Sequence, residues 1–139
     1  MIIKRISKQF SSCTEDLEQV RSFVASTCEG LPFSEAKRNE IVLAIDEACA
    51  NVIRHGYKMS KQGKVCIEIE ARNDYVIFVI KDTCKKIAEN DLQPTKSEDL
   101  CKPGGLGLCL IHHVANSVRL LRHKGQGNWL ELTVNFENK

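Results

Sequence analysis

The chain has 139 residues, 42% of them hydrophobic, so it is long enough for one domain with a single core and too short for two ordinary domains. Its 20 Lys and Arg residues against 18 Asp and Glu residues give a formal net charge of +2, which argues against a chain-wide basic field for nucleic acid or an anionic membrane. Because it also lacks a membrane-spanning apolar run and a cleavable leader pattern, we expect one cytoplasmic domain over residues 1–139.

The N-terminal half predicts a strand followed by two helices. Residues 2–10 alternate loosely between polar and apolar types, which is typical of a strand. Thr14 can cap a helix that ends near Gly30, and Ser34 can cap a longer helix that runs to about Tyr57. Apolar residues recur at core-facing spacing in both helices: Leu17, Val20, Phe23 and Val24 in the first, and Ile41, Ala44, Ile45, Ala48, Val52 and Ile53 in the second.

The C-terminal half predicts two strand pairs and a short helix. We expect strands at 64–72 and 75–81 joined by the Asn73-Asp74 turn, a helix at 106–117, and strands at 118–123 and 129–136 around the turn 124–127. Between them, residues 82–105 form a polar stretch that is too long for a structureless connection in a compact domain, which indicates a functional loop. Helices grouped with an antiparallel sheet predict an α+β two-layer sandwich.

The long helix contains the sequence DEACANVIRHGY. Its Glu47, Asn51 and His55 follow one another at intervals of four residues and therefore share one stripe of the helix. Since other residues already supply an apolar side, this stripe has two interpretations: a solvated face, or three polar groups that face one site.

A second motif, PGGLGL at residues 103–108, opens the short helix. Backbone without side chains can approach an anion closely, and the unpaired N–H groups of a helix start favour phosphate, although a simple hinge would have the same sequence. Asp82 ends a predicted strand. Its carboxylate is suited to accept a hydrogen bond from an exocyclic amine such as that of adenine, but Asp is also a common turn former.

The cysteines do not form a metal or disulfide pattern. There are seven, an odd number, and none has metal-type CxxC spacing, while His112 and His113 are adjacent in the chain. We therefore expect free and mostly buried thiols. Trp129 alternates with apolar residues in the last strand, and packing explains it without a ligand-stacking role.

The order of these motifs resembles the ATPases of the GHKL superfamily, in the branch of the anti-sigma factor serine kinases. The resemblance extends from about Phe10 to Phe136; IVLAIDEACANVIRHGY looks like the family's Asn-containing box and PGGLGLCLIHHVANSV like its second glycine box and following helix. It implies a Bergerat-type ATP-binding fold, in which a mixed, mainly antiparallel sheet is covered by about three helices.

The resemblance assigns roles within the long helix. It implies that Glu47 is the general base for the attacking hydroxyl and that Asn51 holds a magnesium ion at the phosphates. Arg54 and His55 would flank the phosphate region from the same helix. These assignments suit phosphoryl transfer, which requires a proton acceptor and neutralisation of charge.

The resemblance also assigns the nucleotide contacts outside that helix. Asp82 would read adenine, and Gly104, Gly105, Leu106 and Gly107 would wrap the triphosphate of ATP. The cofactors implied are therefore ATP and Mg²⁺.

Residues 83–103 would then form the ATP lid, and one position there departs from the family pattern. The family usually has a glycine two residues after the Asp, where this chain has Cys84. If the backbone requires a positive φ there, a side chain adds strain of roughly 1 to 2 kcal/mol, a factor of about ten in affinity.

The resemblance implies a partner switch. The protein would phosphorylate a Ser or Thr of a STAS-type anti-sigma factor antagonist and sequester a sigma factor, with no direct contact to nucleic acid or a membrane; a homodimer is expected. The alternative is a partner-binding module of the same fold with weak or no phosphotransfer. A binding module would not need the pair formed by Glu47 and Asn51.

Overall fold

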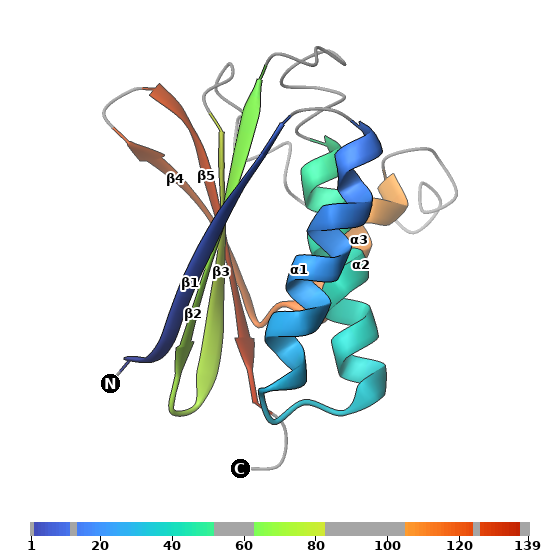
Figure 1. The fold of residues 1–139 in the computed structure, drawn as a ribbon, viewed down its shortest axis with the longest axis vertical. Helices are drawn as coiled ribbons and strands as arrows, with labels where there is room; N and C mark the ends of the chain where they lie inside the picture. The colour runs from blue at the N-terminus through green and yellow to red at the C-terminus, as the bar shows by residue number, and fades with distance from the viewer. Residues whose placement is uncertain (1, 12–13, 52–62, 83–104, 124–125, 137–139) are drawn as a thin grey trace.

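The protein is a two-layer α+β sandwich, as the sequence predicts. The computed structural model describes residues 2–11, 14–51, 63–82, 105–123 and 126–136. Figure 1 shows the strands forming one sheet with the three α-helices against one of its faces, while the opposite face of the sheet carries no helix in the described part of the chain.

The elements follow one another in the predicted order. They are β1 (Ile2–Ser11), a short 3-10 turn η1 (Thr14–Asp16), α1 (Leu17–Glu29), α2 (Glu35–Asn51), β2 (Lys64–Arg72), β3 (Tyr75–Asp82), α3 (Gly105–Val114), β4 (Ser117–His123) and β5 (Gln126–Asn135). The strand order in the sheet is β1-β2-β3-β5-β4, and each pairing between these strands is antiparallel. Within the described ranges, none of the helices combines the length and apolar character of a membrane span.

The core lies between the helices and the covered face of the sheet. Alternate residues of the central strands point into it, because side chains on a strand alternate between its faces. Its largest fully buried side chains come from the three α-helices and from the strands β2, β3 and β5: Phe78, Ile41, Ile45, Ile67, Ile69, Ile80, Ile111, Leu132, Val24, Val76 and Val134. Fully burying a side chain of this size stabilises the fold by about 1.5 to 3 kcal/mol, so this layer fixes how the helices sit on the sheet.

The helix starts agree with the sequence in one case and differ in the other. Ser34 caps α2 as expected: its Oγ accepts a hydrogen bond from the backbone N–H of Lys37 at 3.1 Å. The prediction that Thr14 caps the first α-helix is wrong, because Thr14 begins the 3-10 turn and the residue at the N-cap of α1 is Asp16. The Asp16 carboxylate instead accepts a hydrogen bond from the Ser11 hydroxyl, which joins the turn to the end of β1.

One expected helix end differs from the structure, and another lies outside the described residues. The predicted helix from Ser34 to Tyr57 is described as far as Asn51; Val52, Ile53 and the rest of the segment lie outside the described residues. The short helix ends at Val114 instead of near residue 117, because the backbone N–H of Asn116 already donates to the Thr133 carbonyl of β5 at 2.7 Å.

Candidate functional site

The polar stripe of α2 becomes more covered toward the end of the helix. The buried residues Ile41, Ala44, Ile45 and Ala48 turn one side of α2 to the core and so fix the direction of the stripe. Leu43 on this stripe is 52% exposed, whereas Glu47 and Asn51, one and two turns further on, are half-buried. The two candidate residues therefore do not lie on a fully solvated face.

Packing of α3 against α2 brings a second candidate element toward the same end. The ammonium group of Lys37, in the first turn of α2, donates a hydrogen bond to the carbonyl of Val114, the last residue of α3, at 3.2 Å. His113 Nε2 lies 3.9 Å from the Glu40 carboxylate. Because the end of α3 is held near the start of α2, and the two helices pack together, α3 begins toward the end of α2 that carries Glu47 and Asn51.

The glycine motif forms the first turn of α3. Gly105, Leu106 and Gly107 are helical, whereas we expected a glycine loop before a helix that starts at Leu106. The first four N–H groups of an α-helix have no partner within the helix, and they point along its axis with the positive end of the helix dipole. This turn can therefore hold a phosphate group through its backbone.

The third candidate residue ends the central strand β3. Asp82 is the last residue of β3, and its backbone pairs with Val65 of β2 and with Asn128 of β5. In Figure 1 the end of β3, the end of α2 and the start of α3 lie toward the same end of the molecule. The fold thus directs three elements that are far apart in the sequence toward the same end of the molecule.

Some predicted site residues have no structural description. Arg54, His55, Gly104 and the predicted lid at 83–103 lie outside the described residues. Of the predicted set, the structure places Glu47 and Asn51 with their side chains, and Asp82, Gly105, Leu106 and Gly107 by their backbone.

An ion pair beside Glu47 was missed by the sequence analysis. Arg21 of α1 donates to the Asp46 carboxylate at 3.0 Å, and the two side chains are 43% and 20% exposed. The pair joins α1 to α2 immediately before the candidate base. No sequence signal identifies it, because Arg21 and Asp46 meet only when the helices pack.

The cysteines with described side chains fit the expectation of free thiols. Cys28 and Cys49 are buried, and Cys66 is half-buried. Burial raises the pKa of the Cys28 thiol to about 12 and also raises the pKa of Cys49, which lies two residues after Glu47. Both thiols are therefore protonated at neutral pH and have no nucleophilic role there.

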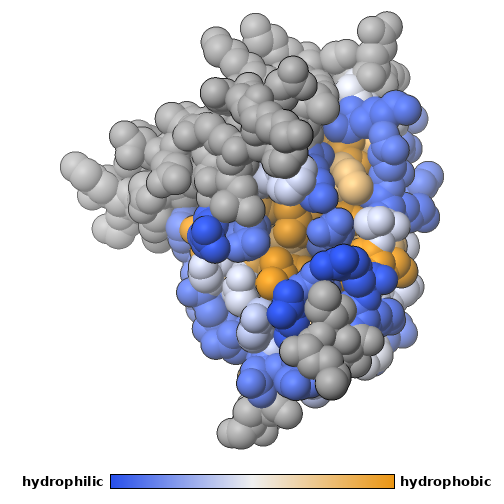
Figure 2. Space-filling view, turned by 90° about the vertical axis from the view of Figure 1, so that its left-hand side faces the viewer, coloured by the Kyte–Doolittle hydropathy of each residue, from blue (hydrophilic) through white to orange (hydrophobic). Residues whose placement is uncertain are grey.

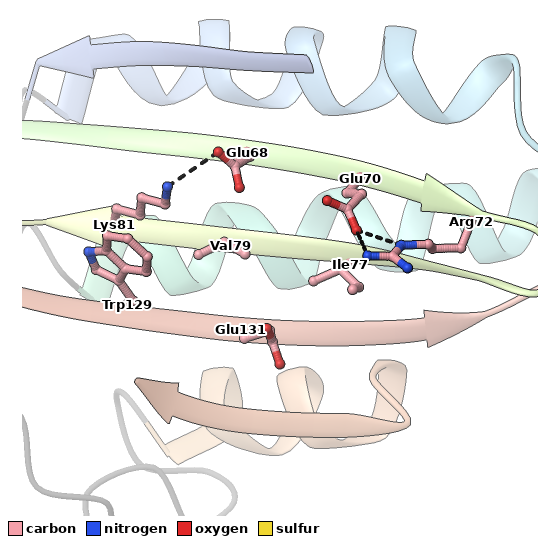
Figure 3. A pocket seen from close by; sticks show the side chains of 8 residues that line it. All are labelled: Glu68, Glu70, Arg72, Ile77, Val79, Lys81, Trp129 and Glu131. Carbon is pink, nitrogen blue, oxygen red and sulfur yellow. Dashed lines mark hydrogen bonds and ion pairs between the residues drawn. The ribbon is translucent and has the colours of Figure 1, made fainter. Parts of the chain in front are cut away.

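The open face of the sheet carries a separate shallow cavity of about 250 Å³. Apolar side chains lie in the middle of this face and hydrophilic ones surround them (Figure 2). The cavity is lined by Glu68, Glu70, Arg72, Ile77, Val79, Lys81, Trp129 and Glu131. Figure 3 shows these side chains on the face opposite the helices, so the cavity is distinct from the candidate site on α2.

Comparison with known proteins supports the fold and identifies the family. The family model described as the histidine kinase-like ATPase domain matches residues 10–134. The chain is 25% identical over 113 residues to the serine-protein kinase RsbW of Bacillus subtilis, covering 76% of this chain and 71% of that protein. It is 28% identical over 136 residues to the anti-sigma F factor of Clostridium beijerinckii, covering 95% of this chain and 94% of that protein.

A solved structure shows the same fold. The structure of the RsbU and RsbW domains of Rv1364c from Mycobacterium tuberculosis superposes with a TM-score of 0.63 at 17% sequence identity. The alignment covers 94% of this chain and 32% of that longer chain. The matched residues 10–134 include α2, the end of β3 and the start of α3. The relatives confirm the predicted resemblance to anti-sigma factor serine kinases. The chain belongs to the histidine kinase-like ATPase domain family.

Proposed function

We propose that this protein is an anti-sigma factor serine kinase that binds ATP with Mg²⁺ and phosphorylates a Ser or Thr of an anti-sigma factor antagonist. The observation that carries the proposal is the meeting, at one end of the molecule, of the Glu47 and Asn51 stripe of α2 with the glycine-containing first turn of α3 and the end of β3. Membership of the ATPase family supports kinase chemistry for this group of elements.

Glu47 and Asn51 have different chemical tasks in this proposal. The Glu47 carboxylate would accept the proton of the attacking Ser or Thr hydroxyl while the hydroxyl oxygen bonds to the γ-phosphorus of ATP. The bond between the γ-phosphorus and the oxygen that bridges it to the β-phosphorus then breaks, and ADP leaves. The Asn51 amide oxygen is a hard ligand that suits Mg²⁺. Since the described residues contain no cluster of three or more His, Cys, Asp or Glu side chains, the phosphates would supply most of the other ligands.

The nucleotide is held by the other two elements. Asp82 would accept a hydrogen bond from the exocyclic amine of adenine, and Gly104, Gly105, Leu106 and Gly107 would hold the phosphates through backbone N–H groups. By the family resemblance, Arg54 and His55 would flank the phosphates, and residues 83–103 would serve as the ATP lid.

The protein substrate approaches along α2. Leu43 is 52% exposed and lies one turn before Glu47 on the same stripe, which makes it a suitable apolar contact for the antagonist segment that presents the hydroxyl. A phosphoryl group adds nearly two negative charges to the docked antagonist, next to Glu47 and Asp46. The repulsion releases the antagonist, and the kinase is then free to sequester a sigma factor in the cytoplasm, as a homodimer.

Calorimetry with ATP and Mg²⁺, followed by phosphotransfer to a candidate antagonist, tests this proposal. We expect Asn51→Ala to abolish Mg²⁺-dependent ATP binding. Glu47→Gln should keep ATP binding and lower the phosphotransfer rate by about 10² to 10⁴, the usual contribution of a general base. The matched controls are Asn39→Ala and Glu40→Gln on the same helix, which should retain both activities.

A partner-binding module without phosphotransfer is the second candidate, and Cys84 is the feature that favours it. In that case Glu47→Gln and Asn51→Ala would leave the affinity for the antagonist nearly unchanged. Absence of ATP binding by both the native chain and Cys84→Gly would contradict the kinase proposal and support the module.

A further inference from the structure

The side chain of Lys81 links three neighbouring strands on the open face of the sheet. Its ammonium nitrogen lies 4.1 Å from the centroid of the Trp129 ring on β5 and 3.2 Å from a carboxylate oxygen of Glu68 on β2. Figure 3 shows Lys81 between these two partners at the edge of the cavity. We call these three residues the Lys81 clamp.

Strand register explains why this clamp forms. Lys81 lies directly opposite Trp129 in the β3–β5 pairing. In the β2–β3 pairing it lies opposite Cys66, so Glu68, two residues further along β2, is its diagonal neighbour on the same face. A long side chain can reach both a direct and a diagonal neighbour in an antiparallel sheet.

The surroundings of the clamp strengthen its contacts. The side chains of Lys81 and Glu68 are 23% and 31% exposed, so water screens their ion pair less than that of a fully solvated pair. A cation over an indole face gains further electrostatic attraction when it is partly removed from water. The clamp therefore resists separation of the three strands at the point where β3 ends.

We propose that Lys81 is a positioning residue for the nucleotide site and that the clamp fixes the backbone of Asp82, the residue that follows it. Asp82 pairs with Val65 and Asn128 on the same two strands that the clamp joins. This inference rests on the proposed function, in which Asp82 reads adenine. The inference adds that the Lys81 clamp, on the face of the sheet opposite the helices, determines how firmly Asp82 is positioned for adenine.

The clamp also supplies a reporter. Trp129 is the single tryptophan of the chain. It lies on the open face, where the cavity that it lines is separate from the candidate ATP site. When ATP engages Asp82, the change at the end of β3 passes through Lys81 to the indole, so ATP titration shifts the Trp129 emission.

Three variants test the clamp. Lys81→Met removes the ammonium group and keeps an apolar stem over the indole, while Lys81→Arg preserves the charge and the contact with the ring. Arg5→Met is the matched control, because Arg5 makes an ion pair with Glu70 elsewhere on the same face. Each variant is compared with the native chain by amide hydrogen exchange without nucleotide, and by calorimetry and Trp129 fluorescence with ATP and Mg²⁺.

We expect Lys81→Met to accelerate exchange at the Asp82 and Asn128 amides, to weaken ATP binding about fivefold and to abolish the ATP-dependent change in Trp129 emission. Lys81→Arg should restore all three properties, and Arg5→Met should leave them at native values. If the Asp82 amide of Lys81→Met exchanges at the native rate, the clamp does not hold the end of β3. Native ATP affinity in that variant, together with faster exchange, would overturn its role in positioning. Failure of the native chain to bind ATP would instead overturn the proposed function, while the exchange data still decide whether the clamp holds the strand end.

Discussion

Glu47 and Asn51 lie one helical turn apart, and their neighbours on α2 explain how they can serve one site. The core side of the helix consists of small and β-branched residues such as Ala44, Ile45 and Ala48, which seat α2 closely against the core. Half-burial of both polar side chains strengthens their electrostatic interactions relative to those in bulk water. The same helix therefore supplies core packing on one side and the candidate site residues on another.

Cys84 departs from the family pattern beside the proposed nucleotide site. The family resemblance calls for glycine at this position. If ATP binding requires a positive φ at this position, Cys84→Gly removes the strain of a side chain there, and we predict about tenfold tighter binding of ATP. Calorimetry with Mg²⁺ measures the change. Cys66→Ala, on the open face of the sheet, is the control and should bind ATP with native affinity; equal affinities for Cys84→Gly and the native chain would show that the strain is absent.

Residue identity predicted some site positions and could not predict others. Glu47, Asn51 and Asp82 are predicted site residues because their spacing and order match a known family, and their roles stay predictions. The Lys81 clamp and the Arg21–Asp46 pair were not found, because each depends on which residues strand register or helix packing places side by side. The residues in these contacts are far apart in the sequence, so local sequence patterns do not predict them.

At the scale of elements, boundaries follow from hydrogen bonds that sequence patterns show only in part. Ser34 was identified as a cap because a hydroxyl precedes a helical apolar pattern, and its bond to the Lys37 amide confirms it. The start of α1 was missed, because the Ser11–Asp16 hydrogen bond joins the preceding strand to the turn. The shorter α3 has a similar cause, since the Asn116 side chain accepts the Asn135 amide at 2.8 Å and draws the chain into the sheet.

The edge strand β1 is attached to β2 by a charged group of residues. Glu70 of β2 has a side chain that is 10% exposed, and it accepts hydrogen bonds from Arg5 of β1 and from Arg72. The hydrogen bond from Arg5 is the largest cause of a Glu70 pKa below its ordinary value of 4.5, and Arg72 adds to it. The carboxylate therefore stabilises the fold in its charged form.

This attachment predicts a pH-dependent effect of Glu70→Gln. Because the pKa of Glu70 is lower in the folded chain, its contribution is fully present above its ordinary pKa of 4.5 and is lost as the pH falls from that value through the lower pKa of the folded state. We expect the variant to lower the free energy of unfolding by about 1 kcal/mol at pH 7, a modest figure because Arg5 is 58% exposed and water screens part of the interaction. Urea unfolding at pH 7 and at about pH 3.5 measures the difference. The difference in free energy of unfolding between Glu70→Gln and the native chain should shrink at the lower pH. The control Glu18→Gln, at an exposed position of α1, should differ little from the native chain at either pH.

At the scale of the whole molecule, the described residues form a continuous core of apolar side chains, and the ion pairs lie outside it. The helices cover one face of the sheet and contribute the candidate site, and the opposite face carries the Lys81 clamp. Composition and element order predicted this two-layer arrangement, since grouped helices can bury their apolar sides only against the sheet. The strand order β1-β2-β3-β5-β4 was not predicted, because the local pattern of the last two strands does not show that β5, and not β4, pairs with β3.

Binding of ATP at the meeting point of α2, β3 and α3 should stabilise the whole fold, since a ligand that binds only the folded chain shifts the unfolding equilibrium by mass action. At an ATP concentration of about one hundred times Kd, with Mg²⁺, the gain is about 2.7 kcal/mol, which corresponds to a rise in Tm of roughly 10 °C for a domain of this size. Thermal unfolding followed by Trp129 fluorescence or circular dichroism measures it.

Variants distinguish this linked stabilisation from a general effect of nucleotide or salt. Asn51→Ala should lose the rise in Tm, measured against the Tm of the same variant without ligand. Asn39→Ala, near the start of the same helix and exposed, should keep the full rise. If ATP raises the Tm of both variants equally, the nucleotide does not bind through Asn51, and the assignment of this end of α2 to the ATP site is wrong.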